Sequence, residues 1–265
     1  MQEGFALGAD GVSLSYSVTG SGPWLVLSNS LATNKEMWQP QLAEFAKSYT
    51  VLTYDTRGHG MSGTGNAPYN FSVLASDVVA IMTKLNIASA KFLGLSLGGM
   101  TGLALALEHP EKLDSLVCCD ARADAPEPYK AIWDQNITRL HEGGMSAIAD
   151  GTLARWFSTP FNAEPENAET IDKIRRMILS TPPEGYEAAA RCLQSLDLLK
   201  DLSQITVPTS YIVGEFDMAA PLSVMQDMAS RTSGGTLRTI PGAAHLSNVE
   251  KPNEFLSAAL DCLNA

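Results

Sequence analysis

The chain has 265 residues, 45% of them hydrophobic, and a formal net charge of −11 at pH 7. A chain of this length buries a large core and accommodates either one catalytic domain with an insertion or two domains. The negative charge, with no cluster of lysine or arginine, argues against nucleic acid as a partner. No apolar stretch reaches the roughly 20 residues that span a bilayer, and no basic segment followed by an apolar run opens the chain, so we expect a cytoplasmic protein without a membrane partner.

The first half of the chain is predicted to alternate between strands and helices. Apolar and polar residues alternate around Gly11 over the first seventeen positions, which indicates a β-hairpin. Short apolar runs then alternate with helical periodicity, as in β–α–β units whose parallel sheet is covered on both sides. In chain order we predict a strand at 24–27, a helix at 36–47, a strand at 50–54, a helix at 71–85, a strand at 91–95, a helix at 97–108 and a strand at 113–119.

The pattern changes between residues 121 and 198. Helical segments follow one another there, interrupted by prolines and by Gly143-Gly144, with no strand among them. We interpret 121–198 as a helical lid inserted into a core formed by 1–120 and 199–265. The alternation then returns, with strands at 209–213 and 236–240, a helix at 222–231 and a closing helix at 252–263.

Ser96 is the candidate nucleophile. It lies in Gly94-Leu95-Ser96-Leu97-Gly98-Gly99, which fits the G-x-S-x-G pattern of a nucleophile elbow between a strand and a helix. The backbone of such an elbow is strained, and the residues two before and two after the nucleophile must be small so that strand and helix can approach. Gly94 and Gly98 meet this need. A glycine-rich turn with an incidental serine is the alternative, and the strand before Ser96 and the helix after it argue against that alternative.

The base that would activate Ser96 is sought by elimination, because only four histidines occur. His59 lies in a polar turn, His109 at a helix end where a cation suits the helix dipole, and His141 in the lid. His245 follows the last predicted strand, at the edge of the sheet where parallel strands present their carboxyl ends. We therefore predict His245 as the general base.

Two aspartates follow predicted strands and are candidates to orient the imidazole of His245. Asp120 follows the strand at 113–119, and Asp217 follows the strand at 209–213. Both satisfy the chain order nucleophile, acid, histidine. We favour Asp217, which precedes the histidine by one strand, and keep Asp120 as the alternative.

Further candidates concern the oxyanion and the substrate. A tetrahedral intermediate needs two backbone N–H donors, and we expect them from Leu97, directly after the nucleophile, and from Leu31, in the loop after the first apolar run. Trp133 is the candidate to line the pocket, although lid aromatics are more often core residues. A substrate carboxylate would need a local cation, for which Arg122 and Arg155 are the candidates. A salt bridge within the lid is the alternative for either arginine.

The cysteines predict no disulfide or metal site. They show no CxxC spacing, and we expect reduced core residues. The chemistry outlined above requires no metal or cofactor. The four cysteines of the chain are Cys118, Cys119, Cys192 and Cys262.

Six motifs are spread over nearly the whole length of the chain: Ser28-Asn29-Ser30-Leu31, Tyr54-Asp55-Thr56-Arg57-Gly58-His59-Gly60, Gly94-Leu95-Ser96-Leu97-Gly98-Gly99, Arg155-Trp156-Phe157, Pro183-Glu184-Gly185-Tyr186 and Ala244-His245-Leu246-Ser247-Asn248. In these motifs the chain resembles the 3-oxoadipate enol-lactonases of the α/β-hydrolase superfamily. The resemblance implies an α/β-hydrolase fold, a mostly parallel eight-stranded sheet flanked by helices, with a helical lid insertion. It also implies hydrolysis of a small enol-lactone to 3-oxoadipate in the breakdown of aromatic compounds, with Ser96, Asp217 and His245 as the matching triad.

Two departures from the family pattern bear on the substrate. Ala32 stands where the family usually has glycine, and the segment 120–126 is acidic where a carboxylate would enter. The alternative function is therefore a carboxylesterase or a lactonase of another small-molecule substrate. A protein that binds small molecules on the same scaffold without catalysis is a further alternative, against which the intact triad argues. The sequence does not predict the oligomeric state.

Overall fold

Eight strands form one central sheet in the computed structural model, which describes residues 1–265. The strands are β1 (Gln2–Leu7), β2 (Ser13–Gly20), β3 (Trp24–Ser28), β4 (Thr50–Tyr54), β5 (Ala90–Leu95), β6 (Leu113–Cys119), β7 (Thr209–Gly214) and β8 (Thr236–Ile240). They lie side by side in the order β1-β2-β4-β3-β5-β6-β7-β8. β1 and β2 form the expected hairpin, β2 is antiparallel to β4, and all other neighbours are parallel. The mostly parallel eight-stranded sheet predicted from the sequence is thus confirmed.

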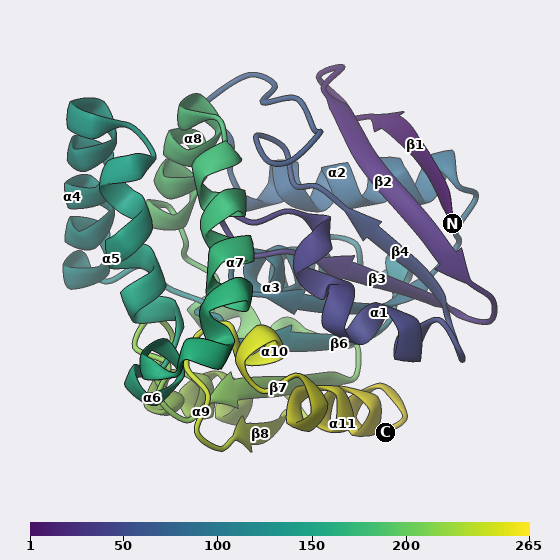
Figure 1. Cartoon of the computed structure of the whole chain (residues 1–265). Coiled ribbons are helices and arrows are strands. Elements are labelled where there is room, and N and C mark those ends of the chain that lie inside the picture. Colours follow the sequence, from purple (N-terminus) through teal and green to yellow (C-terminus); the bar gives the residue numbers. More distant parts are fainter.

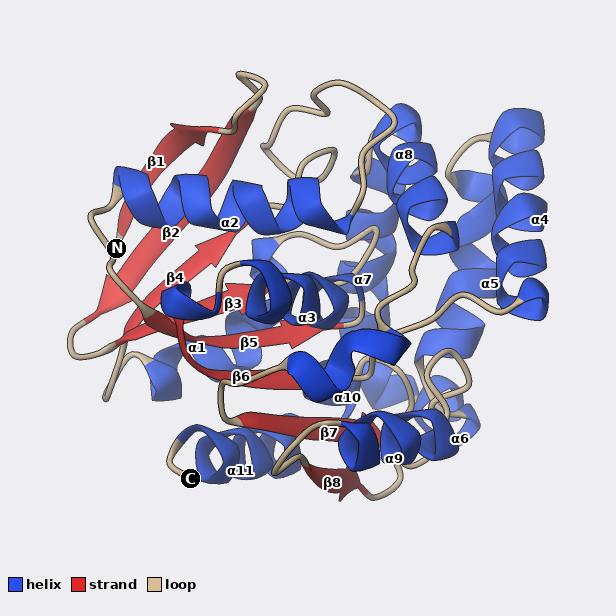
Figure 2. Cartoon of the chain, turned by 180° about the vertical axis from the view of Figure 1, so that it is seen from behind, coloured by secondary structure: helices blue, strands red, loops and turns tan.

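Helices pack on both faces of the sheet. α2 and α3 cover the face turned toward the viewer in Figure 2, and α1 covers the opposite face, which is in front in Figure 1. The single helix expected at 36–47 is a 3-10 turn, η1 (Lys35–Trp38), followed by α1, because Pro40 has no N–H and favours the first turn of a helix. The helices are α1 (Gln39–Phe45), α2 (Phe71–Lys84), α3 (Leu97–Glu108), α9 (Leu222–Arg231), α10 (Ser247–Glu250) and α11 (Pro252–Leu263).

Five further helices lie between β6 and β7, in the segment 121–198, which we call the cap. Figure 1 shows the larger cap helices side by side at one end of the sheet. α7 has the pattern of a surface helix, since its buried residues, Ile174 and Ile178, are four positions apart on one side. The cap helices are α4 (Glu127–Gly143), α5 (Ser146–Trp156), α6 (Thr159–Ala163), α7 (Ala168–Ser180) and α8 (Pro183–Gln194). Short 3-10 turns complete the chain at η2 (Pro110–Lys112), η3 (Pro165–Asn167) and η4 (Leu199–Gln204).

The central strands are apolar because both of their faces are buried. Leu25, Val26 and Leu27 of β3 are fully inaccessible to solvent, as expected for a parallel strand between two layers of helices. The hydrophobic core is continuous from the sheet into the cap, where it includes Leu153 and Ile178. None of the helices combines the length and the apolarity needed to span a bilayer. The loops at the carboxyl ends of β5, β7 and β8 meet beneath the cap.

Candidate active site

Ser96 occupies a strained turn between β5 and α3. Its backbone angles are φ 56° and ψ −116°, a conformation that L-residues rarely adopt. A Cβ atom added to Gly94 would lie 2.2 Å from the carbonyl oxygen of Gly98, and one added to Gly98 would lie 2.2 Å from that of Ser28. Neither position has room for a side chain, which agrees with the elbow inferred from the motif. The turn places the Ser96 side chain at the carboxyl edge of the sheet.

Three side chains from separate loops form a hydrogen-bonded chain at this edge. His245 Nε2 lies 3.0 Å from Ser96 Oγ, and His245 Nδ1 lies 2.8 Å from Asp217 Oδ2. All three residues are buried, with exposed fractions of 7% for Ser96, 3% for His245 and 4% for Asp217. The arrangement suits a serine nucleophile whose proton passes to an imidazole held in one orientation by a carboxylate.

Asp217 rather than Asp120 contacts the histidine. Asp217 lies in the turn after β7, where its Oδ1 accepts the N–H groups of Ala219 at 2.7 Å and Ala220 at 2.9 Å. These bonds leave Oδ2 to face the ring of His245. Asp120, at the end of β6, accepts hydrogen bonds from Gly214 and Ser247 instead. The geometry agrees with the favoured assignment of the acid.

Ser96 and His245 line a pocket of about 240 Å³. The volume is below the roughly 300–1,000 Å³ of pockets that hold drug-sized ligands, so a small substrate is indicated. Trp156 of α5 covers the histidine, with ring centroids 6.2 Å apart, and its carbonyl accepts the N–H of Leu246 at 3.0 Å. Of the residues that the sequence predicted to bind the oxyanion or the substrate, the pocket wall contains Leu31, Arg122, Trp133 and Arg155.

Two backbone N–H groups beside Ser96 are free to bind an oxyanion. Leu97 is the first residue of α3, and the first N–H groups of a helix have no partner within it. Leu31 lies in the loop after β3 and is 3% exposed. Neither N–H donates to an acceptor of the protein. Their role in catalysis stays a prediction.

The sequence profile of the α/β hydrolase fold matches residues 23–252, which include the elbow, the cap and the histidine loop. The chain belongs to the α/β-hydrolase family. Together with the sheet order and the position of Ser96, this match confirms the fold class expected from the sequence.

Known relatives of this α/β-hydrolase include enol-lactonases. 3-Oxoadipate enol-lactonase 2 of Acinetobacter baylyi is 34% identical over 94% of this chain and 92% of its own length. The crystal structure of the enol-lactonase from Burkholderia xenovorans LB400 is 34% identical, with a TM-score of 0.94 over 99% of this chain and 100% of that one. A hydrolase from Pseudomonas aeruginosa PA01 is 36% identical, with a TM-score of 0.93 over 100% and 99% of the two chains. The resemblance inferred from the motifs is confirmed.

The two arginines of the pocket wall differ in their partners. Arg122 is paired with Asp124 at 3.1 Å and lies over the ring of Tyr129, 4.9 Å from its centroid. Its charge is thus already balanced, as the alternative of a salt bridge within the lid anticipated. Arg155 of α5 has no hydrogen-bond or ion-pair partner within the protein, and burial lowers its pKa. Arg155 is therefore the cation that is available to a ligand.

The other three histidines lie outside the pocket. His59 is buried after β4, with Nδ1 3.0 Å from the carbonyl oxygen of Arg57, and burial lowers its pKa. His109 caps the end of α3, and His141 pairs with Glu187 on the cap surface. All four cysteines are buried and free, as expected, and burial raises their pKa values.

Glu250 was not singled out from the sequence. It is 4% exposed, and its carboxylate accepts the N–H and the hydroxyl of Ser158 from the cap and, at 2.9 Å, the N–H of Ala244 next to His245. It therefore joins the cap to the histidine loop. A glutamate before a lysine in a short helix gives no periodic signal, so only the folded contacts could reveal this role.

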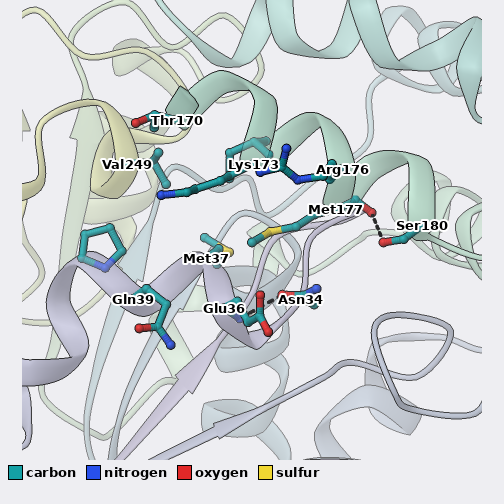
Figure 3. Close-up of a pocket in the computed structure, with 12 residues that line it drawn as sticks. Asn34, Glu36, Met37, Gln39, Thr170, Lys173, Arg176, Met177, Ser180 and Val249 are labelled. Carbon is teal, nitrogen blue, oxygen red and sulfur yellow. Dashed lines mark hydrogen bonds between the residues drawn. The ribbon is translucent and has the colours of Figure 1, made fainter. Parts of the chain in front are cut away.

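A second and larger cavity, of about 690 Å³, lies between η1 and α7 (Figure 3). Its floor includes Met37 and Met177, and its rim carries Lys173 and Arg176. Lys173 is paired with Glu169 at 3.0 Å and Arg176 with Asp172, so neither cation is free. No histidine or catalytic serine lines this cavity. The pocket at Ser96 is therefore the candidate active site.

Proposed function

We propose that this α/β-hydrolase opens a small lactone through an acyl-enzyme on Ser96, with 3-oxoadipate enol-lactone as its substrate. The observation that carries the proposal is the chain of hydrogen bonds from Ser96 through His245 to Asp217 at a pocket of about 240 Å³. Enol-lactonases that are 33–34% identical over more than nine tenths of this chain support the choice of substrate.

The first half of the reaction opens the ring. Ser96 Oγ attacks the lactone carbonyl while His245 Nε2 takes its proton, and the resulting oxyanion accepts the N–H groups of Leu31 and Leu97. Asp217 stabilises the imidazolium. Collapse of the intermediate breaks the ring C–O bond, His245 returns the proton to the leaving oxygen, and the released enol tautomerises to a ketone. The acyl group stays bound to Ser96.

The second half releases the acid. A water molecule attacks the acyl carbonyl while His245 takes one of its protons, and the same two N–H groups hold the second oxyanion. Collapse frees a carboxylic acid and returns the proton to Ser96. In this scheme the ring oxygen becomes the new ketone and the ester carbonyl becomes the new carboxyl group, as in a dicarboxylic 3-oxo acid.

Arg155 is proposed to bind the carboxylate that the substrate carries apart from its lactone ring. The acidic surface of the protein offers no general attraction for an anion, so a local cation is needed. Arg155 lines the pocket, lacks a partner and is half-buried, whereas Arg122 is neutralised by Asp124. A guanidinium holds a carboxylate through two parallel hydrogen bonds. Trp133 from α4 supplies an apolar wall of the same pocket.

The cap is proposed to act as a lid that excludes water and sets substrate size. Residues 121–198 supply Trp133, Arg155 and Trp156 to the pocket, while the core segments 1–120 and 199–265 supply the catalytic groups. Water exclusion strengthens the hydrogen bonds to the oxyanion.

Turnover of three compounds tests the substrate: 3-oxoadipate enol-lactone, a neutral γ-lactone and p-nitrophenyl acetate, with Ser96→Ala as the blank. We expect a kcat/KM for the enol-lactone within the ordinary range of about 10⁴–10⁸ M⁻¹s⁻¹ and far above that for the other two. Ser96→Ala is expected to lose about 10⁶-fold in kcat. Preference for a neutral compound would overturn the substrate, and activity retained by Ser96→Ala would overturn the nucleophile.

Arg155→Gln tests carboxylate recognition separately. Loss of a hydrogen bond between charged groups costs about 1.5–3 kcal/mol, so kcat/KM for the enol-lactone should fall roughly 10- to 150-fold. The value for p-nitrophenyl acetate, which has no carboxylate, should change little. Arg176→Gln, on the exposed side of α7, is the matched control. An equal loss for both compounds would indicate damage to the pocket rather than lost recognition.

A further inference from the structure

The hydroxyl group of Ser30 has no partner within the protein. Ser30 is 0% exposed, and its Oγ makes no hydrogen bond. A buried polar group without a partner has lost its hydrogen bonds to water and gained none in return, so its presence needs an explanation. Several buried side chains share this condition, but among them only Ser30 and Trp133 line the pocket at Ser96. Of these two, only Ser30 lies on the loop that carries the N–H of Leu31.

The backbone of Ser30 is held on both sides. Its N–H donates to Met37 Sδ at 3.2 Å, and its carbonyl oxygen accepts the Asn29 amide at 3.0 Å and the Thr33 hydroxyl at 2.8 Å. The same amide group of Asn29 donates to the carbonyl oxygen of Thr33 at 2.9 Å, so it bridges the loop across the residues between. Both backbone polar groups of Ser30 are therefore engaged. The hydroxyl is the one polar group of this residue that is free to bind a ligand.

The loop of Ser30 and the histidine loop approach the nucleophile from opposite sides. The first follows β3, which pairs with β5 on one side, and the second follows β8, which lies beyond the other side of β5 in the sheet. In the proposed reaction the leaving oxygen must face His245 to receive a proton, whereas the carbonyl oxygen must face the N–H of Leu31. Ser30 thus lies on the side of the carbonyl oxygen.

The hydroxyl of Ser30 can reach the same atom as the N–H of Leu31. Only a few covalent bonds separate the Oγ of a residue from the backbone nitrogen of the next one. A hydroxyl also rotates about its C–O bond and turns its proton toward the acceptor that is present. The oxyanion is the acceptor that develops charge during the reaction, and a hydrogen bond to an ionised acceptor is about twice as strong as one to a neutral acceptor.

We propose that the hydroxyl of Ser30 is a third donor to the oxyanion, beside the N–H groups of Leu31 and Leu97, and is therefore a catalytic residue. It donates as negative charge develops on the carbonyl oxygen of the lactone and later of the acyl-enzyme, and its proton stays on Ser30 throughout. The bond is stronger in the transition state than in the ground state, so it accelerates the reaction. The proposal rests on the proposed function, because this oxyanion forms only when Ser96 attacks the substrate.

Turnover by Ser30→Ala tests the proposal. Loss of one oxyanion donor lowers kcat by roughly 10²- to 10³-fold, and we expect a fall of this size with little change in KM. Because both compounds pass through an oxyanion, kcat/KM should fall for p-nitrophenyl acetate as well as for the enol-lactone. A loss for the enol-lactone alone would assign the hydroxyl to another part of the substrate. That result, or unchanged turnover of both compounds, would overturn the proposal.

Ser115→Ala is the matched control. Ser115 on β6 is also buried with an unpartnered hydroxyl, but it does not line the pocket, so its replacement should leave kcat unchanged. In urea unfolding both variants should be at least as stable as the wild-type protein, since neither loses a hydrogen bond within the protein. A midpoint for Ser30→Ala clearly below that for Ser115→Ala would show that the hydroxyl of Ser30 serves the fold, and the proposal would be wrong.

A tetrahedral adduct provides a measurement that a merely structural role would not change. Trifluoroacetone adds to a serine nucleophile and forms a hemiketal whose ionised oxygen occupies the place of the oxyanion. Its inhibition constant should rise in Ser30→Ala by a factor similar to the loss of kcat/KM, and it should stay the same in Ser115→Ala. An inhibition constant that does not change in Ser30→Ala would contradict a bond to the oxyanion.

Failure of the proposed function has a separate signature in the wild-type protein. If neither compound is hydrolysed and a serine-directed phosphonate does not label Ser96, the acyl-enzyme is wrong, and the role of Ser30 is overturned with it. If p-nitrophenyl acetate is hydrolysed but the enol-lactone is not, the substrate alone is wrong, and Ser30→Ala should still be slow with p-nitrophenyl acetate. An active wild-type protein and an equally active Ser30→Ala would overturn the role of Ser30 alone.

Discussion

Replacing Glu250 with glutamine should loosen the joint between the cap and the histidine loop. The carboxylate of Glu250 accepts the N–H and hydroxyl of Ser158, which lies 92 residues earlier in the sequence, and the N–H of Ala244 in the histidine loop. Glutamine has the same size but only one acceptor oxygen. If that oxygen keeps the Ser158 donors, the new NH₂ group faces the N–H of Ala244, and a buried donor is left without an acceptor.

The cost follows from these contacts. A buried donor that loses its partner costs about 1–3 kcal/mol, and the remaining bonds lose the strength that the charge gave them. We therefore expect Glu250→Gln to lower the free energy of unfolding by about 2–3 kcal/mol. For a protein of this size each kcal/mol corresponds to roughly 2–4 °C in Tm. Because Ala244 adjoins His245, kcat should fall as well.

Urea unfolding at pH 7 measures the stability, with the midpoint compared at constant slope. Glu254→Gln is the control, since Glu254 is exposed on α11 and makes no hydrogen bond through its side chain. If Glu250→Gln unfolds at the same urea concentration as Glu254→Gln, the carboxylate does not hold the cap in the way that its contacts indicate.

Three further predictions concern the buried groups. Asp217→Asn should lower kcat by about 10⁴-fold, because the histidine loses its orienting acceptor, and Asp120→Asn should lower it far less; the opposite order in steady-state assays would assign the acid to β6. Burial raises the pKa of Asp120 in the folded protein, so this carboxyl group stays protonated at pH values at which it is ionised in the unfolded chain. The free energy of unfolding of the wild-type protein should therefore fall by up to about 1.4 kcal/mol per pH unit above roughly pH 4, until the pH passes the raised pKa. The stability of Asp120→Asn relative to wild type should therefore rise as the pH increases above about 4 in urea titrations, and a constant difference would contradict a raised pKa. The four cysteines should resist iodoacetamide in the native protein at pH 8 and react after denaturation, because the thiolate is the reactive form and burial disfavours it; rapid native alkylation, followed by mass spectrometry, would show an open site.

The fold could be predicted because its central strands are covered on both faces. Such strands must be apolar throughout, so the runs at β3, β5 and β6 were visible as short hydrophobic segments. The predicted strand at 91–95 differs from β5 (Ala90–Leu95) by one residue. The division of the helix predicted at 36–47 depends on Pro40. A single proline indicates where a helix starts less clearly than an apolar run indicates a strand.

The site was predictable only where its chemistry needs a fixed residue type. The elbow needs small residues around Ser96, and elimination among four histidines left His245. The choice between Asp120 and Asp217 depends on which carboxyl group meets the ring at 2.8 Å, and no pattern in the sequence encodes that distance. Likewise, whether an arginine is free or paired depends on neighbours brought together by folding, which is why Arg155 could not be separated from Arg122.

The place at which the cap leaves the sheet affects how the protein could diversify. The chain departs after β6 and returns at β7, and these two strands are direct neighbours, with Cys118 beside Tyr211. The ends of the excursion are thus fixed by the sheet, whatever lies between them. Doubling the length of such a loop adds only about 0.6 kcal/mol to its closure cost. Mutations and insertions in the cap can therefore alter the pocket wall while the strands that carry the nucleophile, acid and base keep their register. Substrate selectivity can thus change during evolution without a change in the catalytic groups.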